Sequence, residues 1–407
     1  MAEDTTATQK RWERIAVAAF IGVALWLYWG RWSADLSALY MAAKAVSVGA
    51  AGAIYDVSPS VYDDSPPASW AALLAEMGES GRVTFPYLYP PLWAHLMAPI
   101  AAVVAPLAFF KGALAIHVAA LAASPRLGWR AAQTTGIARG TAVALGLGLA
   151  LVSVAGTTAL AQNQAQITVG FLVLAALALW ASGHSRTAGG LLALAASLKL
   201  APAFFGLLFL IRGDWRAVGA MVGCGAALLA ASLMMGGPEA HGVWLARLDA
   251  LDAATVLSHV NYAPEMLLYQ IDQALRGVAD QNLPTPAWVN LVPKIALLAT
   301  LGAVIARRDL PNGVLALALS LAVALFGPLS WVHYFIVPMM LLPALFLVLP
   351  ARSAWGWIVA VAVTNSLPLL QALQPLGPLP VIWSTVPAIL TYLGLLIRLF
   401  TARTCVA

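Results

Sequence analysis

The sequence predicts an all-α, polytopic integral membrane protein with about twelve transmembrane helices and two large outer loops that carry amphipathic helices. Of its 407 residues, 61% are hydrophobic and only 10% are charged, and the mean hydropathy is +0.84. A soluble domain has about a quarter of its residues charged, because it must cover itself with polar surface. The apolar runs are also continuous rather than alternating, which is typical of membrane helices and not of barrel strands.

The net charge of +5 indicates an orientation in the membrane and not a nucleic-acid partner, because the basic residues stand in short loops between apolar runs. Lys10, Arg11 and Arg14 precede the first span, so the N-terminus is expected in the cytoplasm. Later basic loops recur after every second span and predict a cytoplasmic C-terminus. We interpret residues 1–407 as a single membrane-embedded domain.

Most other polar residues gather in two segments, residues 31–90 and 236–287, which we expect to be outer loops. Residues 91–123 are apolar but broken by prolines, which predicts a dipping piece followed by one span. Residues 187–211 contain Lys199 and Pro202 at their centre. Since a lysine at mid-bilayer is costly unless it reaches water or a partner, we expect two half-length helices that meet near the outer leaflet.

The stretch after the first span holds the first candidate residue, Asp35. Ser33 and Asp35 are typical N-cap residues, and residues 36–50 predict an amphipathic helix on the membrane surface with Tyr40 and Lys44 on one face. Asp35 is therefore either a helix cap or a general base held close to a lipid-borne substrate.

Four further motifs carry candidate residues. "FPYLYPPL" favours an interfacial aromatic belt, and "LAQNQAQITVG" offers amides for hydroxyl or phosphate groups, or for a structural helix end. Lys199 favours an anionic partner such as a lipid phosphate. "GPLSWVHY" brings His333 to a loop–span junction beside Trp331 and Tyr334, where the histidine is either structural or functional.

The remaining histidines and the cysteines give weaker signals. "LSHVNYAPEMLLYQ" offers His259, Asn261 and Glu265 in the second outer loop. No histidine pair has zinc-binding spacing, so no metal is expected. Cys224 lies in an apolar run and Cys405 in the tail, so neither a disulfide nor a metal site is expected from them.

The order of these motifs resembles that of the GT-C glycosyltransferases, and within them glycosyltransferase family 87, the polyprenyl-phosphate-mannose-dependent α-mannosyltransferases. The resemblance covers residues 35–334 and rests on the following residues: Asp35; Tyr40, Ala42, Gly49 and Ile54-Tyr55-Asp56; Tyr89-Pro90-Pro91; "NQAQ" from Asn163; "LKLAP" around Lys199; and "PLSWVHY" up to Tyr334. The family's "GQ" pair corresponds here to Ala161-Gln162 or to Asn163-Gln164. Its "NQS"-like element corresponds to Asn261-Tyr262-Ala263.

The resemblance implies an inverting glycosyltransferase that moves a sugar from a polyprenyl-phosphate donor to a lipid- or glycan-linked acceptor on the outer face, without a cofactor. It implies that Asp35 and His333 lie at the catalytic centre and that Lys199 binds the donor phosphate, for which Lys44 is a second candidate. We expect donor and acceptor contacts from Tyr40, Tyr89, Asn163, Gln164, Asn261, Trp331 and Tyr334.

Alternatives remain open at this point. A secondary transporter or flippase of a lipid-linked sugar would also use broken helices and an intramembrane lysine, although no internal repeat is present. Arabinose, glucose or aminoarabinose could replace mannose, and a structural scaffold would not need Lys199. For each hypothesis in which the protein is an enzyme, we expect a multi-pass protein of the bacterial inner membrane. It would contact membrane lipids and have its active site on the periplasmic face.

Overall fold

The structure is a computed structural model that describes residues 2–57, 65–134, 136–253, 255–277, 285–327, 329–375 and 380–402, with side chains from residue 9 onward except 380–382. Its described residues form eighteen α-helices and four 3-10 helices (η1–η4), and β-structure among them is limited to two isolated bridges. The predicted all-α fold class is therefore confirmed.

The first half of the chain contains these elements: α1 Ala2–Tyr28, α2 Ala34–Ser47, η1 Ala51–Ala53, α3 Ala68–Glu76, α4 Pro91–Val103, α5 Pro106–Ala132, α6 Arg139–Val152, α7 Val154–Ala161, α8 Gln166–Ala181, α9 Ser185–Leu198, η2 Ala201–Phe205 and α10 Gly206–Ile211. The second half contains α11 Trp215–Asp252, α12 Pro264–Arg276, α13 Ala287–Ala306, α14 Asn312–Phe326, η3 Val332–Phe335, α15 Ile336–Leu341, η4 Leu342–Leu347, α16 Ala351–Thr364, α17 Leu367–Leu373 and α18 Pro380–Thr401.

Four helices are long and apolar enough to cross a membrane by length and composition: α5, α11, α13 and the last 19 residues of α18. Shorter apolar helices of 10–17 residues, such as α8 and α14, lie between them. The 27-residue α1 is not among the four, because charged residues occupy its first half. A multi-pass membrane protein follows from these helices.

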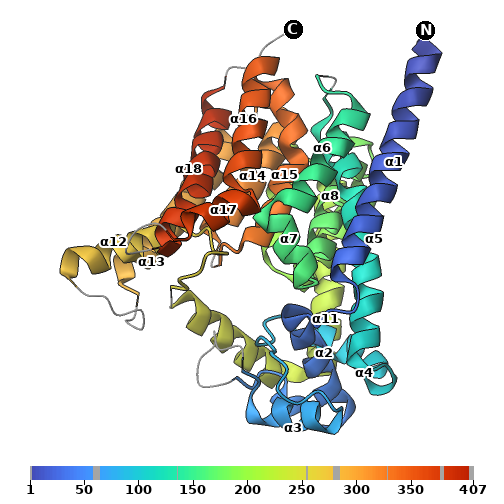
Figure 1. The fold of residues 1–407 in the computed structure, drawn as a ribbon, viewed down its shortest axis with the longest axis vertical. Coiled ribbons are helices and arrows are strands. Elements are labelled where there is room, and N and C mark those ends of the chain that lie inside the picture. Colours follow the sequence, from blue (N-terminus) through green and yellow to red (C-terminus); the bar gives the residue numbers. More distant parts are fainter. Residues whose placement is uncertain are drawn as a thin grey trace.

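The basic segments predicted to be cytoplasmic meet one another in pairs. Arg139 Nε donates to Glu13 at 2.9 Å, which joins the start of α6 to α1. Arg212 donates to the Leu310 carbonyl at 2.6 Å, and Arg307 donates to the carbonyl of Ala402 beyond α18 at 2.9 Å. Figure 1 shows the start of α1 at the end of the molecule opposite α2, α3 and α4.

Helix α2 differs from the amphipathic surface helix that the sequence predicts. It packs along α4, and Tyr40, Met41, Ala42 and Ala43 in its centre are buried. A run of small and apolar residues is equally compatible with lipid and with protein on its faces, and here α4 and α5 supply the protein. The predicted interfacial aromatic belt is also wrong for Tyr87, which is buried with Tyr40 and Trp70 in one cluster.

The predicted breaks near Lys199 and at Pro106 are present, whereas a break expected at Pro99 is not, because α4 continues through that proline. Helix α9 ends at Leu198, Lys199 is extended (φ −144°, ψ 134°), and η2 and α10 follow with Pro202 in the first turn of η2. A second break separates α4 from α5 before Pro106. Helix α5 then continues through Pro125 to Ala132. The sequence predicts a basic cytoplasmic loop over residues 124–140, and the part of it up to Ala132 is helical instead.

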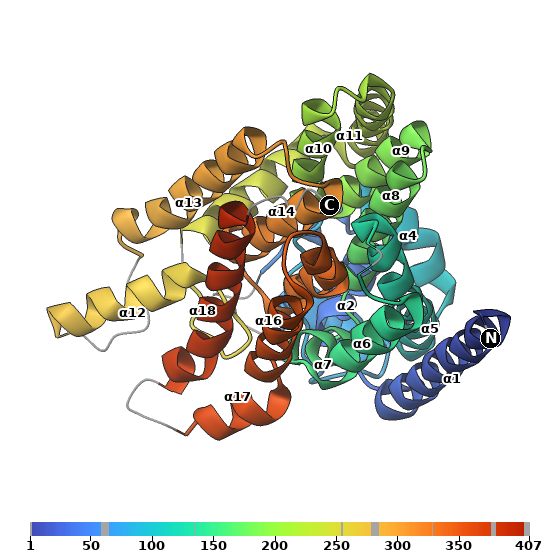
Figure 2. The same cartoon turned by 90° about the horizontal axis from the view of Figure 1, so that it is seen from above.

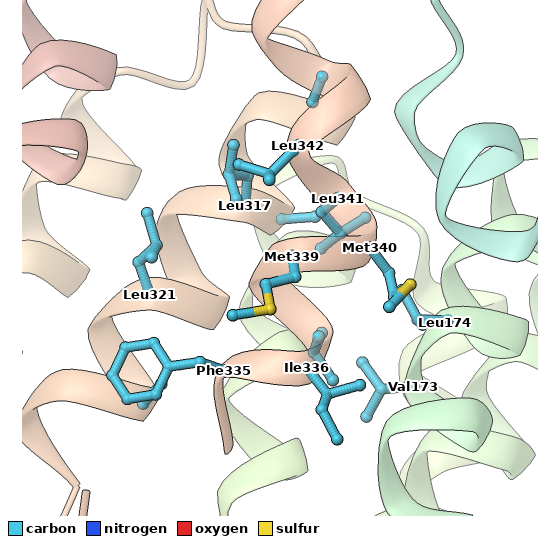
Figure 3. Packing of buried hydrophobic residues seen from close by; sticks show 14 of the residues in the cluster. Val173, Leu174, Leu317, Leu321, Phe335, Ile336, Met339, Met340, Leu341 and Leu342 are labelled. Carbon is cyan, nitrogen blue, oxygen red and sulfur yellow. The ribbon is translucent and has the colours of Figure 1, made fainter. Parts of the chain in front are cut away.

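Two hydrophobic clusters hold the fold together. The larger joins the helices of the main body, and in it α15 packs between α8 and α14 (Figure 3). Phe335, at the end of η3, belongs to this cluster and anchors the "SWVHY" segment. The smaller cluster joins α2, α3, α4 and the start of α5. Seen from above, α2 lies beneath the ring of helices formed by α5, α8, α14 and α16 (Figure 2).

Candidate active site

Asp35 lies in the first turn of α2, one residue after the helix begins. The N-cap position belongs to Ser33, so the alternative in which Asp35 caps the helix is wrong. A carboxylate near a helix N-terminus is stabilised by the unpaired backbone N–H groups there. The side chain is only partly exposed, because protein surrounds almost all of it.

The Gln164 side chain lies beside the Asp35 carboxylate, close enough for its amide to interact with the charged form. Burial raises the pKa of Asp35 to about 6, while this interaction and the nearby Lys199 charge act in the opposite direction. Gln164 is itself buried, and its Oε1 has no hydrogen-bond partner among the described residues. Asp35 is thus a carboxylate that is ionised at neutral pH yet has a raised proton affinity, which is what a general base requires.

Lys199 extends from the break after α9 to the same place. Its Nζ lies 4.7 Å from the centroid of the Tyr334 ring and 5.8 Å from that of the Tyr89 ring. Ring faces attract a cation but leave its three N–H donors unused. Among the described residues no carboxylate is within salt-bridge distance of Lys199, so the ammonium can bind a further anion.

Tyr89 is positioned by the first outer loop. The Tyr55 hydroxyl donates to the Tyr89 carbonyl at 2.8 Å, and the Tyr87 hydroxyl donates to the Pro90 carbonyl at 2.8 Å. The Tyr87 ring packs 5.5 Å from those of both Tyr55 and Tyr89. Burial raises the pKa of Tyr89, and the neighbouring Asp35 charge raises it further, so its hydroxyl remains protonated and able to donate.

His333 and Tyr334 enter from η3. The His333 ring is buried against Tyr334 at 4.8 Å, within electrostatic range of Lys199, and its Nε2 has no hydrogen-bond partner among the described residues. The preceding strand-like residues pair with the second loop, since Tyr262 N donates to Ser330 O at 2.7 Å and Val332 N donates to Val260 O at 2.9 Å. This pairing fixes the partly exposed Trp331 beside Asn261.

The arrangement therefore joins a carboxylate with a raised pKa, an unpaired ammonium, tyrosine rings and a buried imidazole. Among the described residues, no three His, Cys, Asp or Glu side chains gather as a metal site would require. Compared with known protein families, the chain matches glycosyltransferase family 87 over residues 87–333, which is more than half of its length. The chain belongs to glycosyltransferase family 87. No curated protein matches it closely enough to count as a relative.

Membership of glycosyltransferase family 87 makes the protein an enzyme that moves a sugar from a donor to an acceptor, and the resemblance seen in the sequence is confirmed. Four of the residues grouped above, Gln164, Lys199, Tyr89 and His333, lie within the matched range. Asp35 precedes it and reaches the group through the packing of α2 on α4.

Within this glycosyltransferase, five predicted residues are not brought to Asp35 and Lys199 by any contact of the described residues, and one of them is Trp331, which pairs with Asn261. The Tyr40 hydroxyl donates to the Val104 carbonyl at 2.8 Å, inside the smaller cluster. Lys44 lies nine residues further along α2 than Asp35, roughly 13 Å along the helix axis. The Asn261 side chain bonds Val256 O and Ala263 N of its own loop, and the Asn163 side chain bonds His117.

Glu265 is a carboxyl that the sequence indicates only weakly. It lies in the first turn of α12 and is buried, although glutamate there is expected to be exposed. Burial raises the pKa of Glu265 to about 7, with Asp252 adding to the rise and Lys294 opposing it. Lys294 also donates to Asp252 at 2.5 Å. Only the fold brings these three residues together, since they come from α11, α12 and α13.

Proposed function

We propose that this glycosyltransferase moves a hexose, mannose in the first instance, from a polyprenyl-phosphate donor to a hydroxyl of a lipid- or glycan-linked acceptor, with inversion. The observation that carries the proposal is the presence of an unpaired ammonium, Lys199, within electrostatic range of the Asp35 carboxylate. A donor phosphate needs the first group, and an attacking hydroxyl needs the second.

In the proposed reaction, the acceptor oxygen attacks the anomeric carbon while the bond between that carbon and the phosphate oxygen breaks. The acceptor proton passes to the Asp35 carboxylate, and the electron pair of the broken bond leaves with polyprenyl phosphate. A single displacement from the opposite face inverts the anomeric centre. Lys199 stabilises the leaving phosphate, since its charge lies where negative charge develops.

The other side chains have supporting roles in this proposal. The Tyr89 and Tyr334 rings hold the ammonium in place, and their hydroxyls contact the sugar or the phosphate. His333 offers an unpartnered Nε2 beside Lys199 for the phosphate or for the acceptor. Trp331 covers the sugar from the loop side. Tyr40, Asn261 and Asn163 then support the site through the hydrogen bonds described above.

We further propose that the protein is a multi-pass component of the bacterial inner membrane with about twelve crossings, as the sequence predicts; the four long apolar helices and the shorter apolar ones are candidates for most of them. The group around Asp35 then lies on the periplasmic side, because the paired basic residues at the other end of the molecule mark the cytoplasmic side.

Purified protein with polyprenyl-phosphate mannose and membrane lipid extract tests the proposal. Wild-type protein is expected to release polyprenyl phosphate and to mannosylate an acceptor. The Asp35→Asn variant is expected to lower the turnover number by roughly two to four orders of magnitude, the usual contribution of a general base. Asp56→Asn is the matched control, an aspartate of the same outer loop that bonds Ser69 and lies outside the Asp35 group. Full activity of Asp35→Asn would overturn the role of the base, and donor movement across the bilayer without sugar transfer would favour a flippase.

A further inference from the structure

Asn163 occupies an unusual backbone position directly before Gln164. Its φ of 49° is in the left-handed region, which among the described non-glycine residues only Gln133 shares. Glycine and asparagine adopt this region most readily. The turn ends α7, where Gln164 N donates to Ala159 O at 2.8 Å, and it sends the Gln164 side chain toward Asp35.

This backbone position favours one of the two correspondences that the sequence leaves open. Glycine tolerates positive φ better than any other residue, and of the two candidate pairs only Asn163-Gln164 has a residue at positive φ in the place of the glycine of the family's "GQ" pair. Gln162 and its predecessor Ala161 lie at the end of α7 with helical backbone angles. Asn163 thus stands where glycine would be the simplest choice, and it brings a side chain that glycine lacks.

That side chain is held at both ends by α5. Asn163 Oδ1 lies 2.6 Å from His117 Nδ1, and Asn163 Nδ2 donates to Phe110 O at 2.8 Å. All of these polar atoms are buried, with His117 only 5% and Asn163 only 2% exposed. Because the donating Nδ2 fixes the orientation of the amide, Oδ1 is an acceptor and His117 donates from Nδ1. The turn is therefore anchored to α5 by two buried hydrogen bonds.

We propose that His117 and Asn163 are positioning residues that hold the Gln164 amide against the Asp35 carboxylate and so keep that carboxylate ready to accept a proton. The inference rests on the proposed role of Asp35 as general base. Neither residue touches substrate in this proposal; both act through Gln164. A hydrogen bond to the charged form of a carboxyl favours that form, so a misplaced Gln164 makes Asp35 easier to protonate.

The consequence is a pH effect that packing damage would not produce. The titratable groups that face Asp35 are Lys199 from the break after α9, Tyr89 from the segment before α4, and Tyr334 from η3. None of these is touched by a change at His117. If only the Gln164 interaction is lost, the acid limb of the rate profile moves upward while the rate at high pH remains.

The experiment compares pH profiles of kcat/KM for His117→Leu and His117→Asn with that of wild-type protein. The wild-type acid limb is expected near pH 6, as for Asp35. His117→Leu is expected to move it upward by about one unit, so that the rate falls roughly fivefold at pH 6 and less than twofold at pH 8. His117→Asn, whose amide can replace Nδ1–H, is expected to restore most of the wild-type profile.

His241→Leu is the matched control, because His241 is also buried and bonds through both ring nitrogens, to Ser232 and to Gly237 O. Should His117→Leu not fold, Asn163→Gly provides the same test, since glycine accepts the left-handed turn and removes the anchor. The proposal is overturned if either variant loses rate equally at every pH, or if His241→Leu moves the acid limb as far. An active Asp35→Asn would instead show that the base is wrong.

Discussion

At the scale of single residues, Lys199 has a high free-energy cost, because a charged side chain lies here without an ionic partner among the described residues. Its ammonium lies between two tyrosine rings, which satisfy none of its three N–H donors. Asp35 attracts it, but the two do not form a salt bridge. A cation kept unpaired in such surroundings is expected to bind an anion during function.

The Lys199→Ala variant is expected to raise the KM for the polyprenyl-phosphate donor by roughly tenfold to a hundredfold, because charge-assisted hydrogen bonds contribute about 1.5–3 kcal/mol. The KM for the acceptor is expected to change by less than about threefold. Steady-state kinetics with each substrate varied in turn measures both. Lys111→Ala is the matched control, since Lys111 also lies over an aromatic ring, 5.8 Å from Trp29. Equal losses for donor and acceptor would contradict the phosphate role.

Residues of this kind can be recognised in the sequence, because the free-energy cost of a charge in apolar surroundings is evident without a structure. A lysine within an apolar run and an aspartate directly after a span both need an explanation, whatever fold the chain adopts. Tyr40 and Asn261 look similar in sequence, but the structure gives them backbone partners. The partner of Tyr40 lies 64 residues away, at Val104, and no local pattern indicates it. The same holds for His117, whose partner Asn163 lies 46 residues away.

At the scale of elements, α11 shows how a kink positions the site. The helix turns at Gly237 (φ 75°, ψ 163°), a backbone region that is essentially restricted to glycine, and Pro238 follows. Beyond the kink, Trp244 donates to the Leu88 carbonyl at 3.1 Å and Arg247 to the Tyr55 carbonyl at 3.2 Å. The second limb of α11 thus holds the segment that carries Tyr89.

The Gly237→Ala variant is expected to destabilise the protein by about 1–3 kcal/mol, because alanine is strained at these backbone angles. Thermal unfolding in detergent should show a lower Tm, and donor KM should rise because Tyr89 moves. Gly242→Ala, five residues further along the same helix and with open space around its Cβ position, is the control, and it is expected to leave the Tm unchanged or slightly raised. A Tm of Gly237→Ala at or above that of wild-type protein would contradict this account of the kink.

The breaks in the helices were predictable from sequence, whereas the surroundings of the helices were not. A proline cannot donate a helical hydrogen bond, and a helix is interrupted close to both Pro106 and Pro202. The apolar pattern of α2 predicts that the helix is shielded from water, but it does not distinguish between burial in lipid and burial in protein. Since lipid and protein are equally apolar neighbours, only the packing of α4 and α5 distinguishes a surface helix from a core helix.

At the scale of the whole molecule, the candidate active site lies at the seam between the two hydrophobic clusters. Tyr89 packs against the smaller cluster of α2, α3 and α4, and Tyr334 packs against the larger cluster of the main body. Lys199 lies between these two rings and joins the clusters. Because each cluster contributes part of the group, the site is complete only when both are folded and docked.

The side of the membrane on which this seam opens follows from the segments attached to it. Residues 80–85 are tied to the start of α2, since Trp32 Nε1 donates to Val83 O at 2.7 Å and Phe85 N donates to Ala34 O at 3.2 Å. A label at the exposed Ser80 therefore reports on the side where Asp35 lies. Ser182, exposed after α8, reports on the opposite, basic side.

In a background with Cys224→Ser and Cys405→Ser, a membrane-impermeant maleimide is expected to label Ser80→Cys in intact cells whose outer membrane is permeable to it. Ser182→Cys is expected to react only after the inner membrane is broken, because basic loops stay in the cytoplasm. The opposite pattern would put Asp35 and Lys199 on the cytoplasmic side, where nucleotide sugars are available. A lipid-linked donor would then not be needed, because nucleotide sugars are present on that side. The proposal of a polyprenyl-phosphate donor would be wrong.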